Sequence, residues 1–341
     1  MKLLICTQVV DRNDAILGFF HRWIEEFAKR CEHIIVICLF KGEFSLPKNV
    51  TVISLGKERG SSRIMQVFAL LRAVVAHRRE YDAVFVHMNH EYLMVAGILW
   101  RLMRKPVGLW YVHKAVTWRL RIGTFFSEAI FSVSHESFRL KTRKLHMVGH
   151  GIDTSIYKTD RTPRTDVVRI ITVGRISATK RLLEMLAALS ELQRRGIKFE
   201  FTIVGAAVYD SDKAYKNVLR EAIDKSGFSD AVHMRESIPL QEVIAELAQA
   251  DVFLNASKTG SVDKAVLEAM AAGVIPAVAN EAFRDLLSPY GLYTSSFDPV
   301  PFADVIERAA ITDNAPFIEY VRKEHALPTL IPHMLSVLQQ R

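Results

Sequence analysis

Short, fully apolar runs alternate along the chain with longer stretches in which apolar residues recur every three or four positions. Runs rich in Val, Ile and Phe favour strands buried on both faces, and the periodic stretches between them are typical of amphipathic helices. Strands that alternate with helices predict parallel sheets in an α/β fold. Ten such runs occur: KLLICTQVV, HIIVICLF, NVTVISL, AVFVHM, VGLWYVH, AIFSVS, RIITVG, FEFTIVG, ADVFLNAS and VIPAVAN.

The runs form two series, of six and of four, separated by the polar stretch DTSIYKTDRTPRTD. Two series predict two Rossmann-like, doubly wound domains that face a cleft, with the boundary in that polar stretch. We expect domains over residues 1–155 and 156–315, and a C-terminal helical segment over 316–341 that packs back on the first domain. Pro328 and Pro332 are expected to break that segment. Ligands of open α/β sheets bind beyond the carboxyl ends of the strands, so the expected site is the cleft.

Length and composition fit a globular protein of two domains: 341 residues, 50% hydrophobic and 24% charged. The first residues, MKLLICTQVVDRND, reach charged positions too early for a signal peptide, and no span approaches the ~18 uncharged residues of a membrane helix. We therefore expect a cytoplasmic protein that is not an integral membrane protein. The three cysteines lack metal-ligand spacing, and Cys6 and Cys38 lie in strand-like runs, which predicts reduced core thiols.

Positive charge is concentrated in the first half of the chain. Residues 1–165 carry 26 Lys and Arg against 14 Asp and Glu, a net +12, whereas the remainder has a net −4. Either the basic half faces an anionic partner, or the acidic half avoids one. The stretches RIMQVFALLRAVVAHRR, WRLMRK and HKAVTWRLRIGTFF mix cations with apolar residues, which suits peripheral contact with an anionic membrane or a lipid-linked pyrophosphate acceptor. The alternative is an apolar core with a solvated cationic rim.

The strand RIITVG leads into a loop and a helix whose first turn is predicted to carry Lys180 and Arg181. Cations there oppose the helix dipole, at a cost of about 0.3–1 kcal/mol each. A bound pyrophosphate would offset this cost by accepting hydrogen bonds from the helix N–H groups, with Arg175 reaching in from the loop. Solvation, or pairing with Glu184, explains the same cations without a ligand.

A second strand, loop and helix, ADVFLNASKTGSVDKAVLEAMAAG, is predicted to aim at the same place. The backbone N–H groups of Thr259, Gly260 and Ser261 are sterically open, and either Ser261 or Asp263 is expected to cap the helix. Two helix starts would then converge on one anion.

Glu268 falls in the first or second turn of this helix. A carboxylate beside a phosphate site can accept hydrogen bonds from ribose hydroxyls, as in dinucleotide-binding folds. The alternative is an i,i+4 pair with Lys264 on a solvated face. Leu267, Met270 and Ala271 indicate a largely buried helix, which weakens that alternative.

Taken in order, VGRISATK, FTIVG and ADVFLNAS with LEAMAAG resemble the donor-binding half of the retaining glycosyltransferases of family 4, which have the GT-B fold. GHGID resembles that family's Asn-Gly-Ile-Asp near the hinge. The resemblance implies a nucleotide-sugar donor bound in the C-terminal domain, an acceptor domain at the N-terminus, and no metal or other cofactor. It implies that Arg175 and Lys180 bind the diphosphate, that Gly205 ends the second strand of the donor domain, and that Glu268 binds the ribose.

The chain departs from the family pattern at Gly260, where the first glutamate of a pair eight residues apart is common near the transferred sugar. One explanation is a subtype in which TGSVDK binds sugar and phosphate through backbone amides, Asp263 and Lys264; the other is a degenerate site. The retained basic pair and second glutamate favour the subtype. Met234 and Arg235 match the segment that lies beside the nucleotide base.

Four residues of the N-terminal half are candidates, three of them by the same resemblance and His113 by its position. Gly18 matches the glycines that approach the donor phosphate, and a plain turn glycine explains it equally well. His90 matches a histidine that orients the donor sugar, with His87 as the second choice. His113 follows the next strand and is a third candidate for the cleft.

The resulting expectation is a retaining glycosyltransferase that moves a sugar from a UDP- or GDP-sugar to a hydroxyl of a glycan or lipid-linked precursor. His90, Arg175 and Lys180 are the expected catalytic residues, the two cations stabilising charge on the leaving diphosphate. One alternative is a GT-B nucleotide-sugar epimerase, for which no convincing carboxylate pair is found. Another is a non-catalytic nucleotide-sugar-binding protein, suggested by Gly260. Nucleic acid is not an expected partner, because no recognisable motif accompanies the basic residues.

Overall fold

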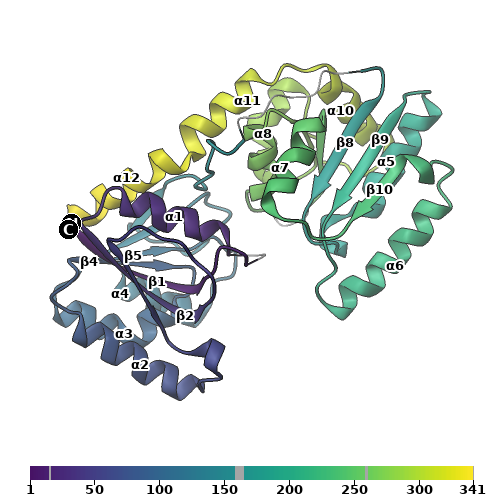
Figure 1. The fold of residues 1–341 in the computed structure, drawn as a ribbon. Coiled ribbons are helices and arrows are strands. Elements are labelled where there is room, and N and C mark those ends of the chain that lie inside the picture. Colours follow the sequence, from purple (N-terminus) through teal and green to yellow (C-terminus); the bar gives the residue numbers. More distant parts are fainter. Residues whose placement is uncertain (15–16, 158–164, 258–259, 341) are drawn as a thin grey trace. The chain divides into compact units, whose positions relative to one another are not determined.

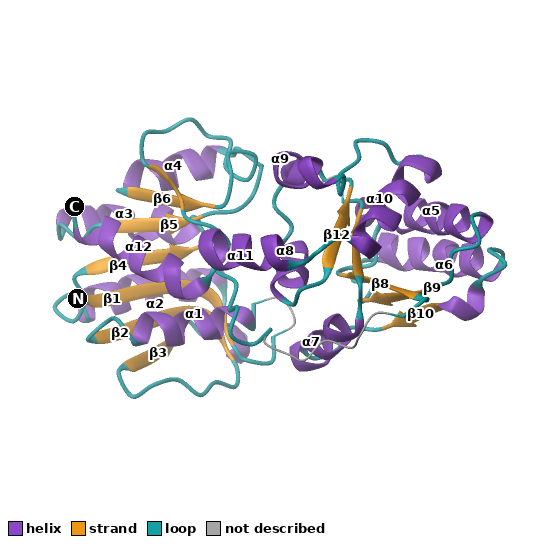
Figure 2. Ribbon diagram, turned by 90° about the horizontal axis from the view of Figure 1, so that it is seen from above, coloured by secondary structure: helices purple, strands orange, loops and turns teal. Residues whose placement is uncertain are grey.

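The computed structural model describes residues 1–14, 17–157, 165–257 and 260–340 (Figure 1). The chain divides into two compact units: unit 1 comprises Met1–Asp153 and Glu324–Arg341, and unit 2 comprises Thr154–Lys323. Each unit is built on one sheet whose paired strands are parallel, with seven strands in unit 1 and five in unit 2. The prediction of an α/β fold with two Rossmann-like parallel sheets is confirmed. Figure 2 shows the strands of each sheet side by side, with helices packed against them.

The unit 1 sheet has the order β3-β2-β1-β4-β5-β6-β7. Its strands are β1 Lys2–Val10, β2 His33–Lys41, β3 Val50–Ser54, β4 Ala83–His87, β5 Val107–Trp110, β6 Ala129–Ser132 and β7 Leu145–Met147. The α-helices are α1 Phe19–Ala28, α2 Arg63–Ala76, α3 Glu91–Leu102, α4 Trp118–Phe126 and α12 Leu327–Gln339, with a short 3₁₀ turn, η1, at Lys57–Arg59. The strand order reverses between β1 and β4, so the helices that follow these two neighbours, α1 and α3, cover opposite faces of the sheet.

The unit 2 sheet has the order β10-β9-β8-β11-β12. Its strands are β8 Val168–Val173, β9 Phe199–Val204, β10 Val232–Arg235, β11 Val252–Asn255 and β12 Ile275–Val278. The α-helices are α5 Leu182–Arg194, α6 Asp210–Asp224, α7 Leu240–Gln249, α8 Lys264–Ala271, α9 Arg284–Leu287, α10 Pro299–Ile311 and α11 Ala315–Tyr320. Four 3₁₀ turns belong to the unit: η2 Ala178–Lys180, η3 Ser229–Ala231, η4 Glu281–Phe283 and η5 Ser288–Tyr290. A π-helical turn, η6 Val321–His325, leads from unit 2 into the C-terminal part of unit 1. In the unit 2 sheet the order reverses between β8 and β11.

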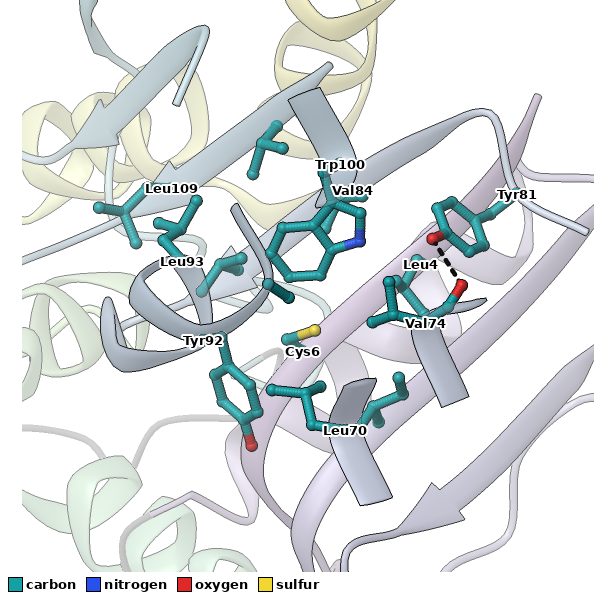
Figure 3. Packing of buried hydrophobic residues seen from close by; sticks show 14 of the residues in the cluster. Leu4, Cys6, Leu70, Val74, Tyr81, Val84, Tyr92, Leu93, Trp100 and Leu109 are labelled. Atoms are coloured by element: carbon teal, nitrogen blue, oxygen red, sulfur yellow. Dashed lines mark hydrogen bonds between the residues drawn. The ribbon is translucent and has the colours of Figure 1, made fainter. Parts of the chain in front are cut away.

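Both faces of the unit 1 sheet are buried, which is why its central strands are apolar at every position. On one face, Leu4 and Cys6 of β1 pack against Leu70 of α2 and Trp100 of α3 (Figure 3). On the other face, Phe27 of α1 lies against Phe85 of β4, with ring centroids 5.1 Å apart, and Phe85 in turn lies against Phe131 of β6. The hydrophobic effect therefore fixes α2, α3 and α4 to one face, with α1 and α12 on the other.

Two strands, β7 and β10, were not among the ten predicted runs. Each lies at the edge of its sheet and pairs on one side only. The sequences LHM and VHMR contain polar residues because an edge strand keeps contact with solvent. The search for fully apolar runs therefore missed these two edge strands, whereas it found the other two, β3 and β12, whose runs are apolar.

The C-terminal chain returns to unit 1 through two backbone hydrogen bonds of Ile152. Its N–H donates to the carbonyl of His325 at 2.7 Å, and its carbonyl accepts from the N–H of Leu327 at 2.8 Å. The helix preceding α12 ends close to Pro328, as predicted, but the predicted break at Pro332 is wrong: Pro332 lies inside α12. Proline leaves the carbonyl four residues earlier without its helical donor. That carbonyl, of Pro328, accepts instead from Arg30 Nη2 at 3.4 Å.

None of the helices in the described part of the chain combines the length and apolarity that a bilayer crossing requires.

Trp100 provides a test of the packing on the α2–α4 side of unit 1. Its side chain is fully buried, so Trp100→Ala should lower the free energy of unfolding of unit 1 by about 3–5 kcal/mol, because the cavity cannot fully collapse. Urea unfolding followed by circular dichroism measures the loss. The control is Ile98→Ala on the same helix, whose side chain is 57% exposed and whose cost should stay within about 0.5 kcal/mol. Equal losses in the two variants would contradict this packing.

Candidate functional site

Strands β8 and β9 end side by side at two glycines of positive φ. The φ angles are 146° at Gly174 and 154° at Gly205. A Cβ atom added to Gly205 would overlap the carbonyl oxygen of Gly174, so the close approach of the two strand ends requires glycine there. A Cβ on Gly174 would lie 3.3 Å from Cε of Lys180. The Lys180 side chain therefore lies directly over the end of β8.

Lys180 and Asp263 join the two loops that leave the reversal point of the unit 2 sheet. Lys180 follows β8 and Asp263 follows β11, the neighbouring strand. Lys180 Nζ lies 2.5 Å from Asp263 Oδ2, and Asn255 Nδ2 donates to the same oxygen at 3.0 Å. Asp263 Oδ1 accepts from the Ala265 N–H at 3.3 Å and so caps α8. Of the two predicted caps, Asp263 is the one used.

The Asp263 carboxylate keeps its charge although most of it is buried. Burial by itself would raise the pKa of Asp263, but the Lys180 ammonium and the hydrogen bonds from Asn255 and Ala265 together hold it below its usual range. The result is a charged pair, held at the point of a doubly wound sheet where ligands commonly bind.

The prediction that Lys180 and Arg181 lie in the first turn of a helix is wrong. Lys180 ends the 3₁₀ turn η2, Arg181 has a left-handed conformation with φ 56°, and α5 begins only at Leu182. The Arg181 guanidinium lies 3.0 Å from Glu184 Oε1 and 3.8 Å from the centre of the Phe297 ring. Pairing with Glu184, the alternative to a ligand, is therefore realised for Arg181. The case for Lys180 rests on its place at the strand end, not on the helix dipole.

Arg175 lies in the loop after β8 and points toward the start of α6. Its Nε is 3.5 Å from Asp212 Oδ2, and its guanidinium lies 5.1 Å from the centre of the Tyr209 ring. Two-fifths of the side chain remains exposed. Arg175 is thus anchored on one side and open to solvent on the other.

Lys264 and Glu268 form the i,i+4 pair that was the alternative to ribose binding. Lys264 Nζ lies 2.5 Å from Glu268 Oε1, one helical turn apart on α8, and Glu268 is in the second turn. Both side chains are mostly buried, so the pair does not lie on a freely solvated face. Such pairs orient a carboxylate without consuming all of its acceptor sites.

Gly260, at which the sequence departs from the pattern that it resembles, lies in the loop before α8. Gly260 has φ 65°, and a Cβ added to it would meet no atom of the described residues within 4 Å. The left-handed backbone, not lack of space, is what favours glycine there. The carbonyl of Ser261 accepts from Asn280 Nδ2 at 3.0 Å. Thr259, predicted to offer a backbone N–H, lies outside the described residues.

Asn255 and Asn280 were not predicted, and both are buried behind this loop. Asn255 holds the Asp263 carboxylate and Asn280 holds the Ser261 carbonyl. A polar amide directly after an apolar strand is the signal that could have found them, in LNAS and AVAN.

Met234 and Arg235 lie on the edge strand β10. Met234 is half-buried, and Arg235 is exposed and paired with Glu242, at 3.6 Å, and with Glu246, both on α7. The carbonyl of Arg235 accepts from the Gly205 N–H at 2.9 Å, which ties this strand to the glycine that ends β9.

Gly18 precedes α1 in unit 1 and lies against the loop that follows β1. A Cβ atom there would be 2.5 Å from the Asp14 carbonyl oxygen, which also accepts from the Gly18 N–H at 2.9 Å. Close backbone packing therefore accounts for this glycine without a ligand.

His87, the second choice for the sugar-orienting histidine, is a core residue. It is the last residue of β4, and its ring stacks on Phe20 with centroids 4.0 Å apart. Burial lowers the pKa of His87 to about 3, so the ring is neutral at physiological pH.

His90, the preferred candidate, directly precedes α3 and is also buried. Within the described residues neither of its ring nitrogens has a hydrogen-bond partner, although Nε2 lies 3.7 Å from Glu91 Oε1, and the ring contacts Tyr111 edge to face, with centroids 5.6 Å apart. Buried polar atoms without hydrogen-bond partners are unusual and mark a position to test. His113 is exposed, and its Nδ1 accepts from the Ala115 N–H at 3.1 Å.

Over the ranges that the structure describes, no group of three or more His, Cys, Asp or Glu side chains could hold a metal ion.

Comparison with known proteins places these unit 2 residues in a named domain. Residues 167–311 match the family model "Glycosyl transferases group 1". A putative colanic acid biosynthesis glycosyltransferase, WcaL of Escherichia coli (strain K12), is 34% identical over 113 residues, covering 31% of this chain and 26% of that protein. The GDP-mannose:cellobiosyl-diphosphopolyprenol alpha-mannosyltransferase of Xanthomonas campestris is 30% identical over 137 residues, 40% of this chain and 35% of that protein. The chain therefore spans about a third or less of the length of these relatives.

The fold of the whole chain is that of known GT-B proteins. The crystal structure of Anabaena Alr3699/HepE in complex with UDP matches 100% of both chains with a TM-score of 0.78 and 16% sequence identity. At that identity the likeness concerns the fold alone.

The Lys180–Asp263 pair makes the stability of unit 2 depend on pH in a predictable direction. Because the pKa of Asp263 is lowered in the folded state, its stabilising contribution is present above about pH 4 and is lost as the pH falls through the folded pKa. Lys180→Ala removes the cation that lowers this pKa, and burial then raises it. The melting temperature of the variant should therefore begin to fall at a higher pH than that of the wild type.

A series of thermal melts from neutral to acidic pH measures this difference. The control is Lys213→Ala, which removes an exposed partner of Asp210 on α6 and should follow the wild-type profile. Superimposable profiles for wild type and Lys180→Ala would contradict the role of the pair.

Proposed function

We propose that the protein is a retaining glycosyltransferase that transfers a sugar from a nucleotide-diphosphate sugar to an acceptor hydroxyl. The observation that supports this most is the Lys180–Asp263 pair, at the strand-order reversal of a unit whose residues 167–311 match the glycosyl transferases group 1 model. Retention of the anomeric configuration follows from the resemblance to family 4. No metal or cofactor has a part in the proposal.

The cations of this site can donate hydrogen bonds to a diphosphate while they stay paired with their carboxylates. An ammonium carries three N–H donors, and Lys180 directs one to Asp263, which leaves two for phosphate oxygens. Arg175 approaches Asp212 through Nε, which leaves the outer edge of its guanidinium for an anion. In this scheme both residues stabilise the negative charge that grows on the leaving diphosphate.

Other residues are assigned to the rest of the donor. Glu268, oriented by Lys264, would accept hydrogen bonds from the ribose hydroxyls, and Met234 and Arg235 would lie beside the base. The glycine ends of β8 and β9 would let the donor approach the backbone. The N–H groups of Gly260 and Ser261 would bind the sugar or phosphate in place of the missing glutamate. The leaving phosphate would itself accept the proton of the acceptor hydroxyl, so no strong protein base is needed.

The donor nucleotide is UDP or GDP in this proposal. Alr3699/HepE is described with UDP and also with UDP-glucose, whereas the Xanthomonas relative is named for GDP-mannose. That relative is also named for a diphosphopolyprenol acceptor and WcaL for colanic acid biosynthesis. A lipid-linked or polysaccharide precursor is therefore the proposed acceptor, and it would bring the protein to the cytoplasmic face of a membrane.

Gly260 favours one second candidate, a protein that binds a nucleotide-sugar without transferring it. Glycine has no side chain that could contact the sugar, and the left-handed backbone at this position favours glycine. Release of nucleoside diphosphate from bound donor in the presence of acceptor extracts separates transfer from binding alone.

Nucleoside diphosphates should stabilise the protein, and Lys180 should be needed for it. Binding at one hundred times the dissociation constant adds about 2.7 kcal/mol to the stability. Lys180→Ala should weaken binding of the preferred diphosphate about 10-fold to 100-fold, since one charged hydrogen-bonding partner is lost. Thermal-shift titration with UDP, GDP, ADP and dTDP measures both. With Lys213→Ala as control, an unchanged affinity of the Lys180→Ala variant for every diphosphate would contradict the proposal.

Glu268 should discriminate between a nucleoside diphosphate and pyrophosphate. If its carboxylate binds ribose, Glu268→Gln should weaken UDP or GDP binding about tenfold or more but leave pyrophosphate binding unchanged. Lys180→Ala should weaken both ligands. Isothermal titration of the two variants with the two ligands gives the comparison. A Glu268→Gln variant that melts earlier but binds the nucleotide normally would show that the pair with Lys264 is only structural.

A further inference from the structure

Large apolar side chains are exposed together on the helices that cover one face of the unit 1 sheet. Among the described residues, ten of the nineteen exposed large apolar side chains lie between α2 and the end of α4. Seven of these are between 57% and 74% exposed: Ile64, Met65 and Phe68 on α2, Ile98 and Leu102 on α3, and Trp118 and Phe125 on α4. Exposed apolar side chains gathered in this way mark an interaction surface.

Helix α2 is apolar on two different sides. Leu70 and Val74 face the core (Figure 3). Ile64, Phe68 and Val75 are exposed and follow one another at spacings of four and seven residues, which places them on a single stripe of the helix. An amphipathic helix whose outer side faces water would carry polar residues at these positions. The outer stripe of α2 is therefore a candidate binding surface.

Cations surround these apolar side chains. Residues 63–126 contain ten Lys and Arg against three Asp and Glu. Nine of the ten are exposed: Arg63, Arg72, Arg78, Arg79, Arg101, Arg104, Lys114, Arg119 and Arg121. In the described structure Arg119 alone among these nine lies within 4.0 Å of a carboxylate, that of Glu91. The other eight are available to anions outside the chain.

The aromatic and basic side chains are interleaved on this surface. The Arg101 guanidinium of α3 lies 4.9 Å from the centre of the Phe125 ring of α4, and that of Arg119 lies 5.5 Å from the Trp118 ring. Aromatic rings with adjacent cations are typical of segments that lie at the boundary between lipid headgroups and acyl chains.

We propose that the outer surface of α2, α3 and α4 docks on an anionic lipid bilayer. Its apolar side chains would enter the interface, while the long Arg and Lys side chains reach the phosphates of the headgroups. The inference deepens the proposed function, because a lipid-linked acceptor would be delivered at such a surface. The binding itself requires no donor.

Two other occupants fit the surface less well. A second copy of the chain, related by a two-fold axis, would bring the same cations face to face, and like charges repel. A nucleic acid would satisfy the cations but would leave Ile64, Phe68 and Leu102 without an apolar environment. An anionic bilayer satisfies both kinds of side chain.

The start of this surface lies near the ligand-binding edge expected of unit 1. In a parallel sheet the crossover helices run against the strands, so the first turns of α2 and α4 lie at the carboxyl ends of the strands. Ile64 and Trp118 are in those first turns, at the same edge as His90 and His113. An acceptor anchored in the bilayer would therefore arrive at the edge where these histidines lie.

Co-sedimentation of the full chain with vesicles tests the proposal without any nucleotide. The protein should bind vesicles of phosphatidylcholine mixed with phosphatidylglycerol, and should not bind vesicles of phosphatidylcholine alone. Two double variants separate the contributions. Arg63→Gln with Arg72→Gln should lower the partition coefficient about fivefold per cation, and Ile64→Ser with Phe68→Ser about tenfold or more in total.

Matched controls lie on α6 or directly beside its ends in unit 2, where Val208 and Val218 are exposed apolar residues and Lys213 and Lys225 exposed cations. Val208→Ser with Val218→Ser, and Lys213→Gln with Lys225→Gln, should bind vesicles as the wild type does. Unchanged melting temperatures show that the unit 1 variants are folded.

The outcomes are distinguishable from those of the donor experiments. Lys180→Ala should lose nucleotide binding and keep vesicle binding. Wild-type protein that binds diphosphates but no anionic vesicles would overturn the membrane surface and leave the transferase proposal standing. Equal vesicle binding by wild type and both unit 1 double variants would overturn it as well. Dimerisation abolished by Ile64→Ser with Phe68→Ser, without vesicle binding, would assign the surface to a second copy instead.

Discussion

The order of the strands in unit 2 is the constraint on which the candidate site depends. Because β8 and β11 are neighbours although 78 residues of chain lie between them, the loops that leave them meet at one edge of the sheet. Lys180 and Asp263 are the contact in which they meet. The glycine at 205 permits the strand ends to approach closely enough for the Lys180 side chain to lie over them. Without that order the same two residues would be an unrelated lysine and helix cap.

The cations of the site are held by carboxylates rather than left free. Lys180 pairs with Asp263, Arg175 with Asp212, and Lys264 with Glu268. Pairing orients each side chain in advance and avoids the cost of burying an isolated charge. A diphosphate would then be bound by sharing donors, with little rearrangement of the protein, which is the condition for electrostatic stabilisation of a leaving group.

In unit 1 the three helices on one side of the sheet have two functions. The inner sides of α2, α3 and α4 form the core with the sheet, and their outer sides carry apolar and basic residues together. The net charge of +12 over residues 1–165 is therefore explained in part by one surface and not by an even coating. A lipid-linked substrate would connect this surface to the transfer chemistry proposed for unit 2.

The sequence by itself determined the α/β class, the central strands and the chemical types of residue at the strand ends, because hydrophobic periodicity and strand length are local properties. It did not reveal the edge strands β7 and β10, which need no apolar run, or the left-handed Arg181 that delays the start of α5. Nor could it decide whether Lys180 was solvated, paired with Glu184 or directed elsewhere. The tertiary structure decided that Lys180 pairs with Asp263 and Arg181 with Glu184. The physical reason is that ion pairing depends on which strands are neighbours, and that order is set by the packing of the whole unit.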